Sequence, residues 1–453
     1  MESAFFSDLL ASIAEHGRSV LKLSPWPRDV EDRAASLIEM CRALLTGRGE
    51  ASGVAMASEI LSRYRSLAPA DKAAVFRAWA DDFGADPTRV EEAVARWNAT
   101  HGEAAASALH SATEPRRQEL FRRLNRVPGG TRALVMMRAD LIGAMGDDRS
   151  LAEVDHDFQH LFASWFNRGF LVLRRIDWSS PAAILEKIIR YEAVHEIRGW
   201  DDLRRRIDPP DRRCYAFFHP ALADEPLIFV EVALTLTPPD AIAPLLAERR
   251  AELTEDKAKV ATFYSISNCQ QGLAGVTFGN FLIKQVVEEL RRDLPRIESF
   301  VTLSPVPGFR RWLETSEDSV VAPALAAARE IVADDDWPND PENAQRAKKM
   351  LEPLAAYYFL KGRRPDGRVY DPVARFHLGN GARLERINWT GDMSPKGLSE
   401  SFGLMVNYLY DLTEIEKNHE AFANAGTIAA SNAVKKLLPK TKIVAPALPA
   451  PQA

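Results

Sequence analysis

Apolar residues recur at three- and four-residue spacing through much of the first 160 residues, which is the pattern of amphipathic helices. The clearest segments predict helices over residues 31–45, 71–83 and 89–97. Short stretches that contain glycine or proline separate the segments, and such residues end helices and turn the chain. Helices joined by short connections favour an antiparallel bundle. We therefore expect residues 1–160 to form a helical bundle domain.

The pattern changes after about residue 160, where runs of β-branched and aromatic residues alternate with helical periodicity. Strands are predicted at 169–174, 214–219, 227–236, 260–267 and 298–304, and helices at 181–191, 279–292 and 320–360. A last β-like stretch contains His377. This alternation predicts a mixed α/β or α+β domain over residues 161–438, built around one sheet. Residues 439–453 are rich in proline and alanine and are expected to form a flexible tail.

Composition narrows the classes of partner. The net charge of the 453 residues is −5, so no overall positive field favours nucleic acid or an anionic membrane. Three scattered cysteines predict neither a zinc cage nor a disulfide framework. The sequence shows no secretory signal, no apolar run of membrane-spanning length and no peroxisomal address. We expect a soluble cytoplasmic protein.

His156 and His160 are four residues apart and would share one face of a helix. The pair lacks the glutamate of a His-Glu-x-x-His motif and a third ligand, so we favour a solvated or packing role over a metal site.

Two segments carry reactive side chains that ordinary packing does not require. Ser304 ends an apolar run and precedes Pro-x-Pro-Gly, and His377 precedes the turn signal Asn380-Gly381. We expect both residues at strand ends, where they meet only if the fold brings those ends together. A serine before proline also caps turns, and a histidine after phenylalanine also packs in cores, so the residues alone leave these readings open.

A glycine-containing loop joins the strand at 260–267 to a helix whose buried face is formed by Ile283, Val286, Val287 and Leu290. Free amides at the positive end of a helix bind phosphate groups, and glycines allow close approach. The candidate phosphate-binding residues are Ala274, Gly275, Val276, Thr277, Phe278, Gly279 and Asn280. The loop matches neither the Rossmann nor the Walker A spacing, and a plain strand–helix junction would also explain it.

Several segments, in the same order, resemble the malonyl-CoA decarboxylase family. They lie at 165–170, 213–218, 225–228, 271–275, 301–309, 376–383, 386–389 and 403–410. The resemblance implies a bundle used for assembly into a homo-oligomer, a dimer or tetramer, followed by a catalytic domain related to the GNAT acetyltransferases. It also implies that the loop at 274–280 holds the coenzyme A pyrophosphate. In the GNAT pattern for this loop only Gly279 matches, whereas Ala274 and Thr277 depart from it.

The resemblance implies decarboxylation of malonyl-CoA to acetyl-CoA and CO2, within fatty acid or malonate metabolism. Ser304 takes the proton-acceptor position of the family and His377 the proton-donor position. Our physical interpretation is that Ser304 binds or relays, while His377 protonates the α-carbon with a pKa near neutrality. Tyr410 is expected to orient the pair. The acyl end would lie where the strand that ends at Ser304 splays from the strand at 260–267.

No cofactor beyond the coenzyme A of the substrate is expected, because the thioester carbonyl itself accepts the electrons. Two alternatives stay open at this point. A GNAT-type acyltransferase would explain the loop but not Ser304 and His377, and it would leave malonyl-CoA intact when no acceptor is present. A non-catalytic acyl-CoA-binding scaffold would lose no turnover on replacement of either residue.

Overall fold

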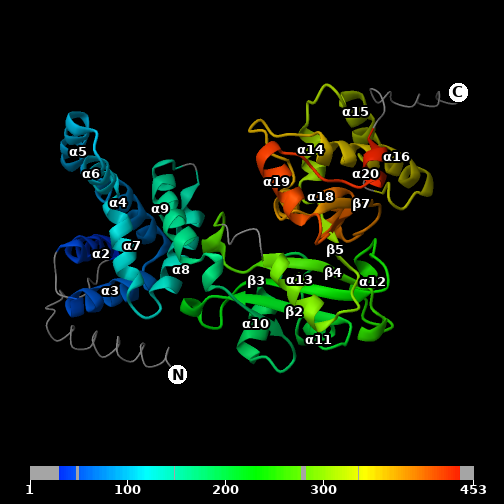
Figure 1. The fold of residues 1–453 in the computed structure, drawn as a ribbon, viewed down its shortest axis with the longest axis horizontal. Coiled ribbons are helices and arrows are strands. Elements are labelled where there is room, and N and C mark those ends of the chain that lie inside the picture. Colours follow the sequence, from blue (N-terminus) through cyan, green and yellow to red (C-terminus); the bar gives the residue numbers. More distant parts are fainter. Residues whose placement is uncertain (1–29, 47–49, 147, 277–281, 335, 439–453) are drawn as a thin grey trace. The chain divides into compact units, whose positions relative to one another are not determined.

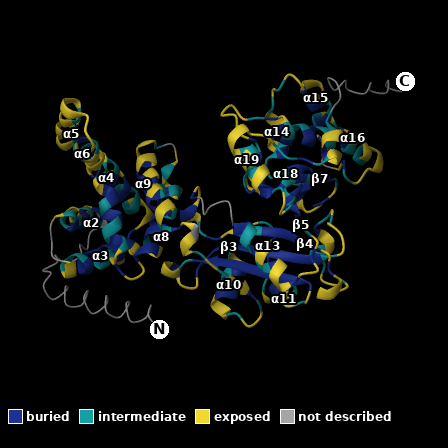
Figure 2. Cartoon of the chain, viewed as in Figure 1, coloured by how far each residue is buried: buried dark blue, intermediate teal, exposed yellow. Residues whose placement is uncertain are grey.

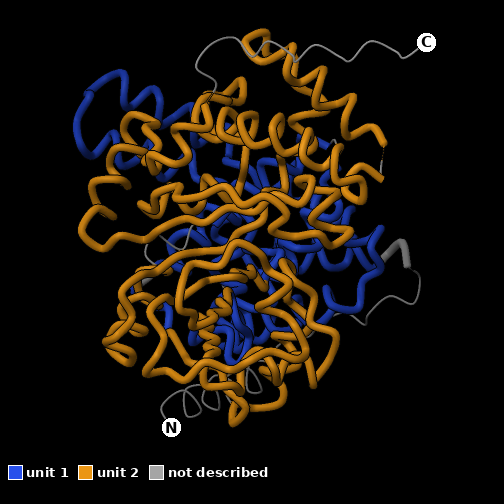
Figure 3. Tube along the Cα trace, turned by 90° about the vertical axis from the view of Figure 1, so that its right-hand side faces the viewer, with its two compact units in different colours: residues 1–172, 218–227, 270–279 blue, residues 173–217, 228–269, 280–453 orange. Residues whose placement is uncertain are grey.

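The computed structural model describes residues 30–46, 50–146, 148–276, 282–334 and 336–438. The chain forms two compact units, each built from three segments (Figure 3). The first unit contains residues 1–172, 218–227 and 270–279, and the second contains 173–217, 228–269 and 280–453. The sequence-based domain boundary at residue 160 stays a prediction, and the tail at 439–453 lies outside the described residues.

The first unit is helical (Figure 1). Its α-helices are α2 (Val30–Leu45), α3 (Glu50–Arg65), α4 (Pro69–Asp82), α5 (Pro87–Thr100), α6 (Glu103–Thr113), α7 (Arg116–Asn125), α8 (Gly130–Met145) and α9 (Ser150–Trp165). Local signals set their ends, as at α5, where Pro87 opens the helix and the Asp86 carboxylate accepts from two free amides. The bundle core is aromatic: Phe121 stacks on Phe158 at 4.1 Å between ring centroids, and Trp79 meets Phe121 edge-on.

The segment 270–276 packs on α8 within the first unit. It contains the 3-10 turn η4 (Gln271–Leu273). The guanidinium of Arg138 donates to the Gly272 carbonyl at 2.9 Å and pairs with Asp155, and its side chain is almost fully buried. A methyl group on Gly272 would lie 1.8 Å from the Val135 carbonyl oxygen, so only glycine fits there.

The second unit contains the sheet. Among the described residues, eight strands form it in the order β1-β2-β3-β4-β5-β8-β6, with β7 paired to β8. The strands are β1 (Val172–Ile176), β2 (Arg212–Phe218), β3 (Pro226–Thr235), β4 (Val260–Asn268), β5 (Ser299–Thr302), β6 (Ser304–Pro305), β7 (Arg383–Asn388) and β8 (Met405–Leu409). Side chains on β2 and β3 are almost all buried, as expected for central strands covered on both faces (Figure 2).

Helices border this sheet, and several of them gather around β7 (Figure 1). They are α10 (Ala182–Tyr191), α11 (Trp200–Ile207), α12 (Ala243–Leu246), α13 (Leu282–Asp293), α14 (Phe309–Thr315), α15 (Ala322–Ile331), α16 (Pro341–Leu360), α17 (Pro372–Gly379), α18 (Pro395–Ser401), α19 (Ile415–Ala425) and α20 (Asn432–Leu437). The expected fold class, a helical region followed by a mixed α/β region, is confirmed. No helix in the described ranges is long and apolar enough to cross a lipid bilayer.

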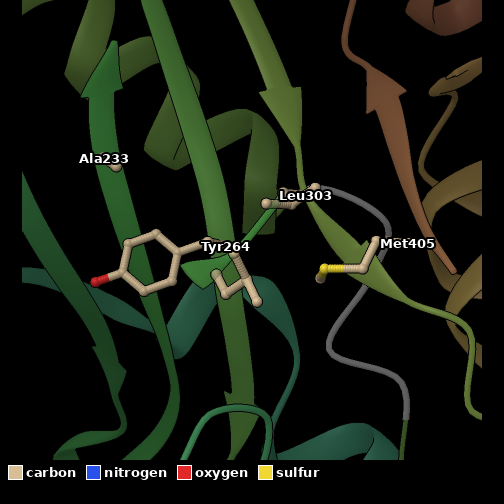
Figure 4. Packing of buried hydrophobic residues seen from close by; sticks show 5 residues of the cluster. Ala233, Tyr264, Leu303 and Met405 are labelled. Atoms are coloured by element: carbon tan, nitrogen blue, oxygen red, sulfur yellow. The ribbon is translucent and has the colours of Figure 1, made fainter. Parts of the chain in front are cut away.

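Strands β4 and β5 pair in parallel and separate after a short overlap. Their register runs from Val260 opposite Ser299 to Phe263 opposite Thr302. Beyond it β4 continues to Asn268 against β3, whereas the chain after Thr302 turns to pair with β8. Leu303, between the two short strands, packs with Tyr264 and Met405 in a buried apolar cluster (Figure 4). Because side chains alternate along a strand, Thr302 and Ser304 point to the other face.

Most predicted elements are confirmed, with shifts of a few residues at their ends. The main correction concerns His377, which lies in the last turn of helix α17 and not in a β-like stretch. Pro372 at the first turn and the Asp371 cap begin this helix, and the turn at Asn380-Gly381 ends it. The run at 168–170 is a 3-10 turn that precedes β1, and the expected helical segment 320–360 is two helices, α15 and α16.

Candidate functional site

Ser304, His377 and Tyr410 meet in the second unit. Ser304 Oγ lies 3.2 Å from His377 Nε2, and Tyr410 Oη lies 2.8 Å from His377 Nδ1. Ser304 begins β6, His377 belongs to α17, and Tyr410 follows β8 directly. Residues 73 positions apart therefore form a hydrogen-bonded pair, with a tyrosine on the far side of the ring.

Local geometry explains why each side chain points inward. Ser304 comes two residues after Thr302 on an extended chain, so both hydroxyls share one face. His377 is carried by α17, whose first turn is anchored by the Asp371 carboxylate accepting from the Ala374 amide at 2.8 Å. The ring is stacked on Tyr408, with 4.6 Å between centroids and 24° between planes.

Thr302 is a further member of this network that the sequence analysis did not single out. Its hydroxyl oxygen accepts from Ser304 Oγ at 2.8 Å and from the Tyr408 backbone amide at 3.1 Å. Its carbonyl oxygen accepts from the Asn407 side-chain amide at 2.7 Å. The alternation of residues 299–304 could have indicated that Thr302 shares a face with Ser304, but its partners on β8 could not be read from the sequence.

Burial controls the electrostatics of the three groups. His377 is fully enclosed, and desolvation lowers its pKa to about 3, so the ring is neutral at pH 7. This corrects the expectation of a pKa near neutrality, which holds for a solvated imidazole. Burial also raises the pKa of Tyr410 well above its ordinary value, so its phenol keeps its proton.

A cavity of about 250 Å³ opens on this pair. Ser304 and His377 both line it, whereas Tyr410 does not and so supports the ring from behind. The other lining residues are Val194, Ile228, Phe263, Tyr264, Ser265, Ile266, Asn268, Pro305, Pro372, Val373 and Phe376. They include the part of β4 beyond its pairing with β5, so the cavity lies where these strands separate. A cavity of this size suits an acyl group together with part of the arm that carries it. It is too small for a whole ligand that includes a nucleotide.

Two acidic side chains, the half-buried Glu192 and the fully buried Glu231, lie next to Ser265 at the wall of the cavity. The Ser265 hydroxyl donates to Glu192 at 2.8 Å, and the Ser267 hydroxyl donates to the same carboxylate at 3.0 Å. Glu231 lies close by, and burial together with Glu192 raises its pKa to about 8. The serines at alternate positions of β4 were visible in the sequence, but their acidic partner was not.

The candidate phosphate loop is described only in part. Ala274, Gly275 and Val276 follow η4 in the first unit, and Gly275 has a positive φ of 76°, which suits glycine. Thr277, Phe278, Gly279 and Asn280 lie outside the described residues. Phosphate binding at this loop therefore stays a prediction.

His156 and His160 lie exposed on α9. Within the described ranges, no group of three or more histidine, cysteine or acidic side chains is placed to hold a metal ion.

Comparisons with known proteins cover most of the chain. The malonyl-CoA decarboxylase C-terminal domain matches residues 169–446, and the malonyl-CoA decarboxylase N-terminal domain matches residues 83–166. The chain belongs to the malonyl-CoA decarboxylase family. The mitochondrial malonyl-CoA decarboxylase of Anser anser anser is 38% identical over 418 residues, covering 83% of this chain and 82% of the relative. The mitochondrial enzyme of Rattus norvegicus is 36% identical, covering 84% of this chain and 85% of the relative.

Solved structures of the family agree with the fold. Malonyl-CoA decarboxylase from Rhodopseudomonas palustris superposes with a TM-score of 0.86 and 55% identity, covering 89% of this chain and 99% of that one. The protein from Agrobacterium vitis gives a TM-score of 0.84 and 54% identity, covering 89% of this chain and 100% of that one. The resemblance recognised in the sequence is therefore confirmed over both the helical and the mixed regions.

Proposed function

We propose that this chain is a carboxy-lyase that converts malonyl-CoA to acetyl-CoA and CO2, with Ser304 and His377 acting at the acyl end. One observation carries the residue assignment: the Ser304 hydroxyl and the His377 ring lie 3.2 Å apart at the wall of one cavity. The family and its named members support the reaction.

The cavity suits the loss of CO2 from a carboxylate. Its lining residues are mainly apolar, and its polar side chains are neutral hydroxyl, amide and imidazole groups, with no lysine or arginine among the lining residues. A malonyl carboxylate held there loses most of its hydration, and decarboxylation moves its charge onto the thioester enolate. Removing water and providing preorganised donors for the new charge both favour that step.

The proton that converts the enolate to acetyl-CoA then comes from the pair of Ser304 and His377. As the new C–H bond forms at the α-carbon, the N–H bond of His377 breaks. Ser304 holds the imidazole ring in place or relays its proton. Tyr410 donates to the other ring nitrogen, which stabilises the charge left on the ring until water returns a proton. The N–H proton of the ring becomes the new C–H proton of acetyl-CoA, and the water that reprotonates the ring is left as hydroxide in the solvent.

The pantetheine arm and the pyrophosphate of the substrate need binding sites outside this cavity. The amide groups of the pantetheine arm can pair with the edge of β4 beyond Phe263, where the pairing of β4 with β5 has ended. We propose that residues 274–280 bind the pyrophosphate, and that the reaction uses no cofactor beyond the coenzyme A of the substrate.

Incubation with malonyl-CoA and no acceptor tests the proposal. The native chain should release CO2 and acetyl-CoA, and Ser304→Ala and His377→Asn should each lower kcat by about a hundredfold or more with folding retained. Ser399→Ala, at an exposed serine of α18, is the matched control and should keep the native rate.

Three outcomes would contradict it. Intact malonyl-CoA together with acyl transfer to an added amine would support the acyltransferase instead. Tight binding of acyl-CoA with no turnover would support a scaffold. Full turnover in both variants would remove Ser304 and His377 from the mechanism.

We also propose that the chain works in the cytoplasm, as a homo-oligomer (dimer or tetramer), in fatty acid or malonate metabolism. Its three cysteines are free and buried, which suits a reducing compartment. Light scattering on the protein eluted from a size-exclusion column would measure the number of subunits. Cell fractionation would test the location. A monomer, or a membrane-enclosed location, would contradict these proposals.

A further inference from the structure

We propose that Thr302 is a positioning residue that, by holding the Ser304 hydroxyl, fixes His377 in the tautomer with its hydrogen on Nε2. The inference deepens the proposed function and rests on it, because it names the residue that prepares the proton donor. Thr302 touches neither the cavity nor the reacting atoms, so it would act through Ser304.

The hydroxyl oxygen of Thr302 accepts two hydrogen bonds. The Tyr408 backbone amide can only donate, so the Thr302 hydroxyl oxygen must accept from it, at 3.1 Å. The same oxygen accepts the Ser304 hydroxyl proton at 2.8 Å. Thr302 is fully buried, so no water competes for these positions.

The direction of the bond from Ser304 to Thr302 determines the direction of the bond between Ser304 and His377. Ser304 has one hydroxyl proton, which is directed to Thr302, so Ser304 can only accept from His377. Nε2 must therefore carry the hydrogen in its 3.2 Å contact with Ser304 Oγ. Because the buried ring is neutral, Nδ1 is left with a lone pair, which accepts the Tyr410 phenol proton at 2.8 Å. Each hydrogen bond between Thr302 and Tyr410 along this chain then has one defined donor and one defined acceptor.

The tautomer decides what the cavity receives. With hydrogen on Nε2, the ring presents a transferable proton beside Ser304, at the wall where the enolate forms. With hydrogen on Nδ1, the same wall would meet a lone pair, and the proton would point away toward Tyr410. Without the Thr302 hydroxyl, Ser304 is free to donate to Nε2, which favours the unproductive tautomer.

A merely structural role is the competing explanation, because Thr302 also joins β5 to β8 through its carbonyl and hydroxyl oxygens. A structural role predicts lower stability of Thr302→Val with an unchanged kcat for the folded fraction. A positioning role predicts a lower kcat at nearly constant KM, and rescue by a serine that restores the hydroxyl.

The kinetic experiment compares variants of the full chain with malonyl-CoA. Thr302→Val should lower kcat at least about tenfold with KM changed less than about threefold, and Thr302→Ser should recover most of the rate. The matched control is Thr262→Val, at a fully buried threonine of β4 whose hydroxyl contacts Thr235, and its kcat should stay native. Equal kcat in Thr302→Val and the native chain, or equal losses in the valine and serine variants, would overturn the proposal.

Nitrogen NMR of the chain labelled with 15N-histidine reads the tautomer directly and needs no turnover. The sequence has nine histidines, and the signals missing in His377→Asn identify the ring. In the unmodified chain Nε2 should show the protonated shift and Nδ1 the unprotonated one, and Thr302→Val should shift this population. The opposite tautomer in the unmodified chain would overturn the inference even if Thr302→Val fails to fold. Failure of the proposed function would instead appear as a native chain that releases no CO2.

Discussion

The imidazole of His377 lies inside the second unit, stacked on Tyr408 and hydrogen-bonded to Ser304 and Tyr410. Two hydroxyl partners satisfy both ring nitrogens without any carboxylate, so nothing in its contacts stabilises a positive ring. Desolvation then dominates and lowers its pKa to about 3. At the scale of single residues, His377 is therefore a neutral hydrogen-bonding group whose charged form the fold disfavours.

This burial predicts a pH dependence of stability. The ring titrates near 6.5 when unfolded and near 3 when folded, so between these values the unfolded state binds a proton that the folded state does not. As the pH falls from 6.5 toward 3, His377 should lower the free energy of unfolding by about 1.4 kcal/mol per pH unit. Urea unfolding at several pH values should therefore give a shallower pH slope for His377→Asn than for the native chain.

Other buried groups do not obscure that comparison. Burial lowers the pKa of His195 to about 4, which gives a slope of the same sign, and raises that of Asp371 to about 6, which gives the opposite sign. Both residues are present in the two proteins, so their contributions cancel in the difference. Identical slopes would show that the folded His377 binds protons as readily as the unfolded one.

Helix α17 links the site to its surroundings at the scale of elements. Asp371 caps its first turn, and His377 lies in its last turn, so the cap and the reactive ring share one short rigid element. Asp371 is fully buried, and its raised pKa reflects the cost of enclosing a charged carboxylate. That cost offsets part of the cap's contribution to stability.

Removal of this cap should affect both stability and rate. We expect Asp371→Ala to lower the free energy of unfolding by about 1 kcal/mol, and to lower kcat because α17 no longer holds His377 firmly. Asp340→Ala is the matched control, since Asp340 caps the exposed start of α16 by accepting from two amides. It should lose comparable stability at native kcat. Equal kcat in the two variants would separate the cap of α17 from the site.

At the scale of the whole molecule, the chain passes between its two units several times. Each excursion into the helical unit needs a place to dock there. Segment 270–276 docks on α8, where Gly272 lies against the Val135 backbone and its carbonyl accepts from Arg138. The helical unit is thus built partly from chain that belongs, in sequence, to the sheet region.

A methyl group at Gly272 should disrupt this docking. Gly272→Ala places a carbon 1.8 Å from the Val135 carbonyl oxygen, so we expect a loss of at least about 1–3 kcal/mol and a lower Tm. Gly143→Ala, within α8, is the control, because a Cβ added at Gly143 has no heavy atom within 4 Å. This change should raise stability by about 0.5–1 kcal/mol. A Tm unchanged by Gly272→Ala would mean that the segment does not rest on α8.

Much of this protein could be predicted from its sequence because the relevant forces act between near neighbours. Helical periodicity, proline starts and β-branched runs predicted the helical region, most strands and the mixed region. The sequence indicates Ser304 and His377 because the segments that contain them resemble one family. Tyr410 lies in another segment that resembles the same family. The β-like stretch predicted at His377 is wrong because the turn at Asn380-Gly381 can follow a helix as well as a strand, whereas Asp371-Pro372 is a helix start.

The tertiary structure alone decided how these residues act on one another. Side chains 73 positions apart meet because β6 and α17 pack in the same unit, and no local pattern encodes that distance. The partners of Thr302 lie on β8, and the pKa of His377 depends on the elements that exclude water from it. Residue types and local elements follow from the sequence, whereas burial, pairing and tautomer follow from contacts between segments far apart in the chain.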